Sequence, residues 1–210
     1  MKKNNIFQIC KKKINSNIVN TRSKKKLEIL NCKDCDFDFF LKEKISNLKK
    51  NKLDSFRLKN AGLQLIEKKK DISNGLKQAK EYIKAHIKTK KKLKILDIGC
   101  SWGYFLKECK NKGHNVYGLE INKIRNKYVN NKLKIKCLNN IDEIQNFKFD
   151  KIFLFYSLEY IKNPQEYLIS LKNILELNGE IIIYTPNKND HINQILNLKD
   201  YRNFFYEENS

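Results

Sequence analysis

The sequence predicts an α/β fold: a doubly wound, mostly parallel sheet with helices on both faces, preceded by a small cysteine-containing N-terminal module. The first observation behind this prediction is a buried strand, a glycine turn and the start of a helix over residues 93–106. The second is that apolar runs of strand length recur at 152–156 and 181–183, with a helical spacing of apolar residues between them. Strands that alternate with helices imply right-handed crossovers, and these build a parallel sheet.

The remaining elements follow in chain order. Residues 47–92 are rich in lysine and carry apolar residues at partly helical spacing, which predicts one or two helices that cover the sheet and cap the ligand cleft. A second short strand is expected at 116–119, and a helix begins at Pro164 with Asn178-Gly179 as its expected end. The chain therefore divides into a small module at 1–46, a helical segment at 47–92 and a main domain at 93–210.

The glycine turn is a candidate nucleotide site. Gly99 and Gly103 let the backbone pass close to a ligand, and the helix that follows presents free N–H groups. Glu120, about twenty residues later at a strand end, suits the diol of a ribose. Asp97 disfavours phosphates beside the turn and favours a cationic sulfonium or ammonium, and bulky Trp102 is a poor neighbour for a pyrophosphate. These residues favour S-adenosylmethionine over a dinucleotide.

Three blocks of sequence carry a resemblance to a known family. Residues 96–103, Leu-Asp-Ile-Gly-Cys-Ser-Trp-Gly, resemble motif I of the class I S-adenosylmethionine-dependent methyltransferases, and residues 118–120 resemble the acidic loop after it. Residues 149–164 are similar to the family's fourth strand and its L-E-H-I-x-x-P segment, and residues 175–187 to the strand that ends in T-P-N. The resemblance implies a Rossmann-like sheet, S-adenosylmethionine as methyl donor and a small-molecule acceptor, such as a nucleotide-linked sugar or a quinone-type hydroxyl.

The resemblance also implies which residues form the site. Ser101 stands at the family's middle glycine, and its hydroxyl is expected to help cap the following helix. Tyr160 stands where the family usually has a histidine, and a tyrosine with an ordinary pKa near 10 is a much weaker base, so no catalytic residue is assigned. Two asparagines after the third strand are expected to approach the adenine. The cofactor-binding residues are therefore Asp97, Gly99, Ser101, Gly103, Glu120, Asn139 and Asn140.

The cysteines near the N-terminus predict a degenerate zinc-ribbon-like segment. Cys32 and Cys35 form a C-x-x-C knuckle, and Cys10 offers a third ligand, with Lys13 in place of a fourth. The arrangement resembles the ribbon that precedes the methyltransferase domain in some family members, with one ligand missing. Bound zinc and a decayed ribbon without metal both remain open. The other cysteines are expected to be small apolar residues in the core: Cys100, Cys109 and Cys137.

Composition argues against two classes of partner. The formal charge is +21, but the basic residues are 40 lysines and four arginines spread along the chain, so no specific nucleic-acid site is expected. A basic RNA-binding methyltransferase would need clustered charge. No apolar run approaches the ~20 residues that span a bilayer, and no secretory signal follows Met1, so no membrane partner and a cytoplasmic location are expected.

The C-terminal part of the chain limits the functional prediction. Complete family members continue after the T-P-N strand through a helix and two more strands, whereas only residues 188–210 remain here. The sequence therefore predicts a truncated form, or a partner chain that covers the exposed edge of the fifth strand. Two functions stay open: methyl transfer to a small molecule, and a non-catalytic remnant that binds the cofactor or a protein partner.

Overall fold

The computed structural model describes most of the main domain and three strands before it. The described residues are 15–20, 26–32, 37–39, 69–161, 163–185 and 187. The chain divides into two compact units, one of residues 1–50 with 186–210 and one of residues 51–185.

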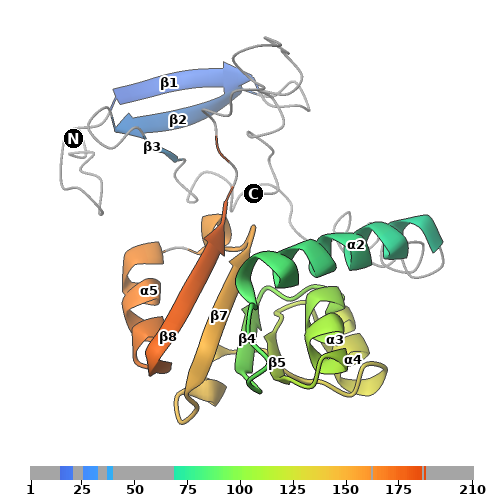
Figure 1. The fold of residues 1–210 in the computed structure, drawn as a ribbon. Coiled ribbons are helices and arrows are strands. Elements are labelled where there is room, and N and C mark those ends of the chain that lie inside the picture. Colours follow the sequence, from blue (N-terminus) through green and yellow to red (C-terminus); the bar gives the residue numbers. More distant parts are fainter. Residues whose placement is uncertain are drawn as a thin grey trace. The chain divides into compact units, whose positions relative to one another are not determined.

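The larger unit contains a five-stranded parallel sheet with the strand order β6-β5-β4-β7-β8 (Figure 1). Its strands are β4 (Lys94–Ile98), β5 (Asn115–Leu119), β6 (Lys136–Leu138), β7 (Phe149–Phe155) and β8 (Leu175–Tyr184). Its helices are α2 (Lys69–His86), α3 (Tyr104–Asn111), α4 (Lys123–Asn131) and α5 (Pro164–Lys172), with short 3-10 turns η2 (Ile141–Ile144) and η3 (Leu158–Tyr160). This arrangement confirms the predicted Rossmann-like fold class.

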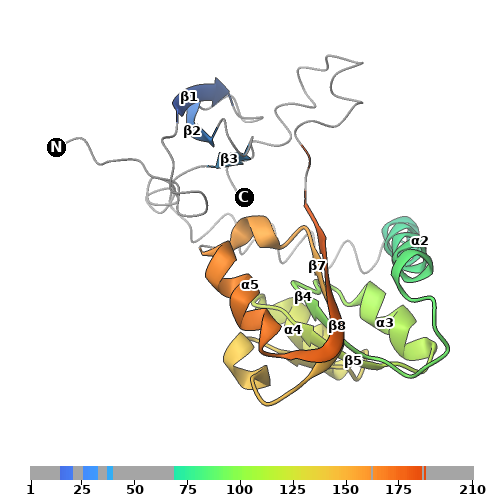
Figure 2. The ribbon, with the colours of Figure 1, turned by 60° about the vertical axis from the view of Figure 1, so that its left-hand side comes forward.

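Helices cover both faces of the sheet, as Figure 2 shows for α5 on one side and α2 and α3 on the other. Neighbouring residues of β4 point to opposite faces, so Ile95 packs under α2, α3 and α4 while Leu96 packs under α5 and η2. Ile95 and Leu96 are both fully buried, as expected for a strand between two parallel neighbours. The apolar run of this strand therefore reflects two cores, one on each face.

The helix after β7 ends earlier than the sequence predicted. Pro164 occupies its first turn as expected, but α5 stops at Lys172 instead of continuing to Asn178-Gly179. Leu175 already pairs with Phe149, so the residues assigned to the helix end belong to an irregular part of β8. A Cβ at Gly179 would lie 2.9 Å from the Phe149 carbonyl oxygen, which explains a glycine in this close approach. Pairing of β8 with β7 therefore ends the helix before the chain reaches the stop signal at Asn178-Gly179.

The smaller unit contains an antiparallel sheet in the order β1-β2-β3, formed by β1 (Asn15–Asn20), β2 (Lys26–Cys32) and β3 (Phe37–Phe39). Cys32 is buried at the end of β2, and the other two predicted zinc ligands, Cys10 and Cys35, lie outside the described residues. Within the described part, no group of three His, Cys, Asp or Glu side chains is placed to hold a metal. The zinc site stays a prediction.

One described helix, α2, lies in the stretch from 47 to 92 where the sequence predicts helices, and residues 47–68 lie outside the described part. Its side chains at Ala79 and Ile83 enter the same core as Ile95. None of the described helices is both long and apolar enough to pass through a bilayer.

We expect Gly118→Ala to lower the free energy of unfolding by about 1–3 kcal/mol, because the interior around this β5 residue has no room for a methyl group. The added Cβ would lie 2.7 Å from Cys100 Sγ and 3.1 Å from Cys137 Sγ. Urea unfolding measures the change. The matched double variant Gly118→Ala with Cys100→Ala removes the nearest sulfur and should recover part of the loss, and equal stability of Gly118→Ala and wild type would contradict this packing.

Candidate functional site

The loop between β4 and α3 forms the centre of the site, at the carboxyl ends of the strands. Gly99, Ser101 and Gly103 all have positive φ angles, of 76°, 52° and 70°. The N–H groups of Gly99 and Cys100 both donate to the Leu119 carbonyl, at 2.8 and 3.2 Å. The loop is therefore held against the end of β5 by main-chain hydrogen bonds.

Packing is a second reason why positions 99 and 103 hold glycine. A Cβ at Gly99 would lie 2.3 Å from Ser157 Oγ, and a Cβ at Gly103 would lie 2.9 Å from Leu133 Cδ1. Ser157 Oγ itself lies 2.8 Å from the Ile98 carbonyl oxygen, to which it donates. The loop thus touches the end of β7 on one side and the residues after α4 on the other, and each approach depends on the missing side chain.

Two buried carboxyl groups lie beside this loop. Glu120 is 6% exposed, and its two oxygens accept the N–H groups of Ser101 at 2.9 Å and Asn122 at 2.8 Å. Asp97 is 3% exposed, and burial, with the nearby Glu120 charge, raises the pKa of Asp97 to about 8. At neutral pH Asp97 is therefore mostly protonated, and a cation placed beside it would favour its ionised form.

The segment after Glu120 is shaped by the start of α4. Asn122 caps this helix, since its side chain accepts the N–H groups of Ile124 and Arg125 at 3.0 and 3.2 Å. Ile121, between the acid and the cap, is 80% exposed. The sequence analysis did not predict Ile121 as a site residue. An apolar residue directly after a strand-end acid is nevertheless a pattern that indicates an exposed apolar surface.

A family model described as a methyltransferase domain matches residues 58–208. The chain belongs to this methyltransferase family. Membership confirms the recognition that the three sequence blocks made, and S-adenosylmethionine as the cofactor.

The methyltransferase is similar to curated and to solved proteins. It is 31% identical over 115 residues to "Ubiquinone biosynthesis O-methyltransferase" of Rickettsia typhi, covering 51% of this chain and 47% of the relative. It is 29% identical over 115 residues to the protein of the same name from Rickettsia bellii strain OSU 85-389, covering 51% and 48%. The chain thus spans about half the length of the curated relatives it matches. The solved plantazolicin methyltransferase BpumL in complex with SAH aligns with a TM-score of 0.48 and 23% identity, covering 79% of this chain and 65% of that one.

The structure brings five of the seven predicted cofactor residues together: Asp97, Gly99, Ser101, Gly103 and Glu120. The expectation that the Ser101 hydroxyl caps α3 is wrong, because Gly103 holds the N-cap position and no side chain caps this helix end. Ser101 contributes its N–H instead, to Glu120.

The other two predicted residues, Asn139 and Asn140, follow β6 and are exposed. The Asn140 amide serves the turn itself, accepting the Asp142 N–H at 3.2 Å and donating to the Asp142 carboxylate at 2.8 Å. Both asparagine N–H groups donate to the Glu143 carboxylate. Their approach to an adenine stays a prediction.

A buried amide supports the same edge of the sheet, and no sequence pattern predicted it. Asn126 of α4 donates to the carbonyl groups of Glu120, Cys137 and Leu138, at 3.3, 3.2 and 3.1 Å. It therefore ties the carboxyl ends of β5 and β6 to α4. Cys100, from the glycine loop, lies 3.7 Å from Cys137, sulfur to sulfur, and both thiols are buried as predicted.

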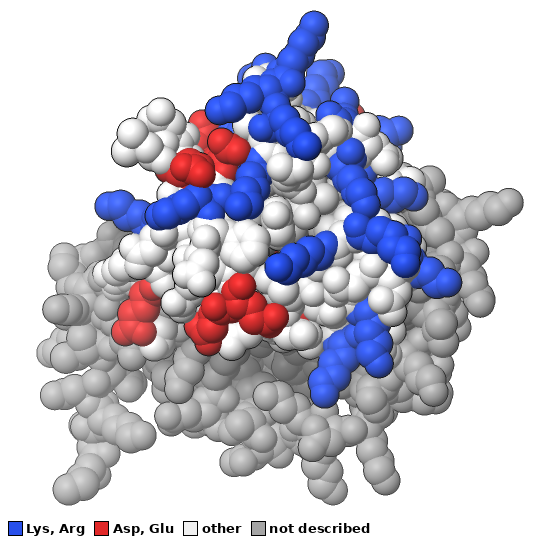
Figure 3. All heavy atoms as spheres, turned by 90° about the horizontal axis from the view of Figure 1, so that it is seen from below, with Lys and Arg blue, Asp and Glu red and all other residues white. Residues whose placement is uncertain are grey.

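On the face that Figure 3 shows, lysine and arginine side chains gather along the top and the right-hand side, whereas the acidic side chains form groups on the left and at the lower centre.

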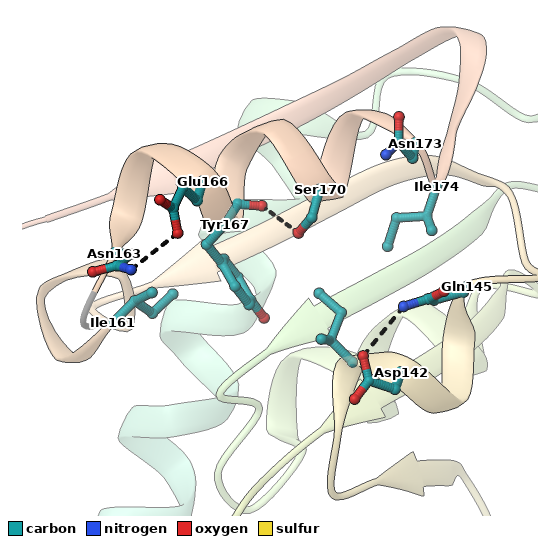
Figure 4. Close-up of a pocket in the computed structure, with 10 residues that line it drawn as sticks. Asp142, Gln145, Ile161, Asn163, Glu166, Tyr167, Ser170, Asn173 and Ile174 are labelled. Carbon is teal, nitrogen blue, oxygen red and sulfur yellow. Dashed lines mark hydrogen bonds between the residues drawn. The ribbon is translucent and has the colours of Figure 1, made fainter.

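A cavity of about 530 Å³ lies elsewhere, between α5 and η2 (Figure 4). Its polar groups bond to one another, since Asn163 donates to Glu166 at 2.9 Å and Gln145 donates to Asp142 at 3.2 Å. None of the seven predicted cofactor residues lines it. This cavity is therefore separate from the glycine loop.

We expect stability to fall with rising pH because of Asp97. Its pKa is raised from 3.8 to about 8, so the folded state holds a proton that the unfolded chain releases above about pH 4. The stabilisation is complete below about pH 4 and is lost as the pH rises through about 8. Asp97→Asn imitates the protonated form, so its melting temperature should fall less than that of wild type between about pH 5 and pH 9. The exposed Asp142→Asn is the control and should follow wild type; a parallel fall in all three proteins would refute the assignment.

Proposed function

We propose that this methyltransferase transfers the methyl group of S-adenosylmethionine to a hydroxyl of a small quinone-type acceptor. The observation that carries the proposal is the Glu120 carboxylate joined to the left-handed glycine loop, with protonated Asp97 beside it. The names of the Rickettsia relatives support an oxygen acceptor of the quinone type over a nucleotide-linked sugar.

The residues present fit the cofactor. Each Glu120 oxygen accepts one backbone N–H, and a carboxylate oxygen has two acceptor positions, so one position on each oxygen is left for a ribose hydroxyl. The exposed Ile121 side chain offers an apolar surface to the adenine ring. Asp97 would interact with the cationic part of the donor, and Gly99 and Gly103 keep the loop backbone close to it.

Transfer to a hydroxyl depends first on alignment. The donor supplies a methyl group on a positively charged sulfur, and holding the acceptor oxygen in line with that methyl lowers the barrier without any covalent intermediate. The Ser157 hydroxyl, after β7, donates to the Ile98 carbonyl at the end of β4. This bond holds the two strand ends together beneath the donor and the acceptor.

A second candidate function is a cofactor-binding module without turnover. The observation that favours it is Tyr160, which is half-exposed at the position where the family usually has a histidine. Measuring S-adenosylhomocysteine release with catechol as acceptor separates the two functions, because the module binds the donor and releases none.

We expect Glu120→Ala to weaken S-adenosylmethionine binding at least about tenfold, equivalent to ~1.4 kcal/mol, because it removes the acceptors for the ribose diol. Isothermal titration calorimetry measures the affinity. Glu120→Gln keeps the volume of the side chain and should weaken binding as well, while Glu176→Ala, on exposed β8, should bind like wild type. Wild-type protein without heat of binding at about millimolar donor, or Glu120 variants that bind normally, would remove the basis of the proposal.

We also expect the affinity for S-adenosylmethionine to rise with pH through about 8, because a sulfonium favours the ionised form of Asp97. S-adenosylhomocysteine has the same amino group and no positive sulfur, so the difference between the two ligands isolates the effect of the sulfonium. Calorimetry at several pH values measures this difference. Asp97→Asn should abolish it, and an identical pH dependence for both ligands would contradict the placement of Asp97.

A further inference from the structure

An aromatic cluster lies beside the candidate site. It consists of Tyr82 and His86 from α2, Phe155 from β7, Tyr156 directly after β7, and Tyr184 from β8. The Tyr82 ring stacks on Phe155 with centroids 4.2 Å apart and lies 4.9 Å from the Tyr184 ring. His86 Nε2 lies 2.7 Å from the Tyr184 hydroxyl oxygen. We call these five residues the phenol-imidazole cluster.

Tyr156 is held in an unusual conformation. Its φ angle is 50°, in the left-handed region that a bulky aromatic residue rarely adopts. Its N–H donates to the Tyr184 carbonyl at 2.8 Å, which holds the strained backbone in place. The side chain is nevertheless 48% exposed, so packing of the ring does not account for the strain. Strain of this kind accumulates at functional sites.

The cluster adjoins the glycine loop through two contacts. Ser157, the next residue after Tyr156, occupies the space where a Cβ of Gly99 would lie. Phe105, in the first turn after the loop, packs against Phe155 with centroids 5.0 Å apart. Figure 2 shows α2 and α3 on the same side of the sheet, so the two elements that flank the loop and the cluster share one face. An acceptor lying on Tyr156 would therefore be close to a donor lying on the loop.

The polar groups of the cluster differ in whether they can accept a proton. Burial, with Tyr156 and Tyr184 nearby, raises the pKa of Tyr82 to about 12, so Tyr82 remains a hydrogen-bond donor at neutral pH. It is therefore unsuited to accept a proton. His86 is the imidazole of this cluster, and its Nε2 lies within hydrogen-bond distance of the Tyr184 hydroxyl. Its link to the Tyr184 hydroxyl provides a route from the surface of the cluster to the imidazole.

We infer that the phenol-imidazole cluster binds the planar, hydroxyl-bearing ring of the acceptor, and that the His86 and Tyr184 pair takes up the proton of the methylated hydroxyl. The inference rests on the proposed function and names the acceptor side of the same site. Tyr156 and Tyr82 supply the ring surfaces, and Tyr184 touches the reacting hydroxyl. His86 acts through Tyr184 and is a positioning and proton-holding residue.

We take an acceptor with an aromatic hydroxyl. The acceptor oxygen forms a bond to the methyl carbon while the carbon–sulfur bond breaks, and its electron pair stays on sulfur as a neutral thioether. The hydroxyl proton passes to the Tyr184 oxygen as the proton of Tyr184 passes to Nε2 of His86. The imidazolium then releases this proton to solvent. No oxidant, reductant or metal takes part in the balance.

Binding of a model acceptor tests whether the phenol-imidazole cluster binds the acceptor ring. Protein saturated with S-adenosylhomocysteine is titrated with catechol and with cis-cyclohexane-1,2-diol, which has similar hydroxyls and no aromatic face. We expect catechol to bind at least about tenfold more tightly than the diol. Tyr156→Gly should remove most of this preference while leaving folding intact, because glycine relieves the positive φ angle. Tyr117→Ala, a tyrosine of β5 that packs on Phe147 and Phe149, is the control.

Turnover tests whether the His86 and Tyr184 pair takes up the hydroxyl proton. We expect His86→Gln, which keeps a hydrogen-bonding partner for Tyr184, to lower kcat for catechol by about 100-fold with little change in KM. Added imidazole should restore turnover to His86→Ala in a saturable manner. Tyr184→Phe should lower kcat like His86→Gln, while Tyr117→Phe should have no effect.

The outcomes separate this inference from the proposed function. Failure of wild-type protein to bind S-adenosylhomocysteine overturns both. Normal binding of S-adenosylhomocysteine without any preference for catechol, or a preference that survives Tyr156→Gly, overturns the acceptor site alone. An unchanged kcat in His86→Gln overturns the proton route alone, whereas catechol that binds to wild type and is not methylated overturns the proposed methyl transfer together with the proton route.

Discussion

The hydrogen bond from the Ser101 N–H to the Glu120 carboxylate is the constraint on which the candidate site depends. It joins the loop after β4 to the residue after β5, two segments that are nineteen positions apart in sequence. Ser101 makes this bond with a positive φ angle of 52°, and a hydrogen bond to a carboxylate, worth about 1.5–3 kcal/mol, offsets the strain of that conformation. The same carboxylate also accepts the N–H of Asn122, so one side chain sets the positions of both loops.

The two acids of the site have different environments, and this difference gives them different functions. Glu120 has two backbone N–H groups as partners, whereas Asp97 is buried with the Glu120 charge nearby. Burial first, and repulsion by the Glu120 charge second, raise the pKa of Asp97, so a proton resides on Asp97 at neutral pH. A cationic ligand changes this balance, which couples donor binding to proton release. The chemistry of the site thus follows from two neighbouring acids, Glu120 and Asp97, that differ in their hydrogen-bond partners and in their protonation.

Much of the fold and part of the site were predictable from local sequence. Apolar runs such as 152–156 identify strands covered on both faces, and Gly99 and Gly103 mark a turn that no other residue type forms easily. The end of α5 was predicted wrongly because Asn178-Gly179 is a local stop signal, whereas the pairing of Leu175 with Phe149 is a long-range contact. The Ser101 cap was wrong for a similar reason: the residue's N–H is used by an acid from another strand.

The sequence by itself determined the order of strands and helices, the glycine loop and the family, because each depends on residues close together in the chain. Only the tertiary structure decided which groups meet. Packing of α2 against β7 and β8 brings Tyr82 and His86 to Tyr184, about a hundred positions away. Burial of Asp97 in the folded protein, with the Glu120 charge nearby, raises its pKa and so keeps it protonated at neutral pH. Burial and distance arise from contacts between remote segments, and no local pattern of residues encodes them.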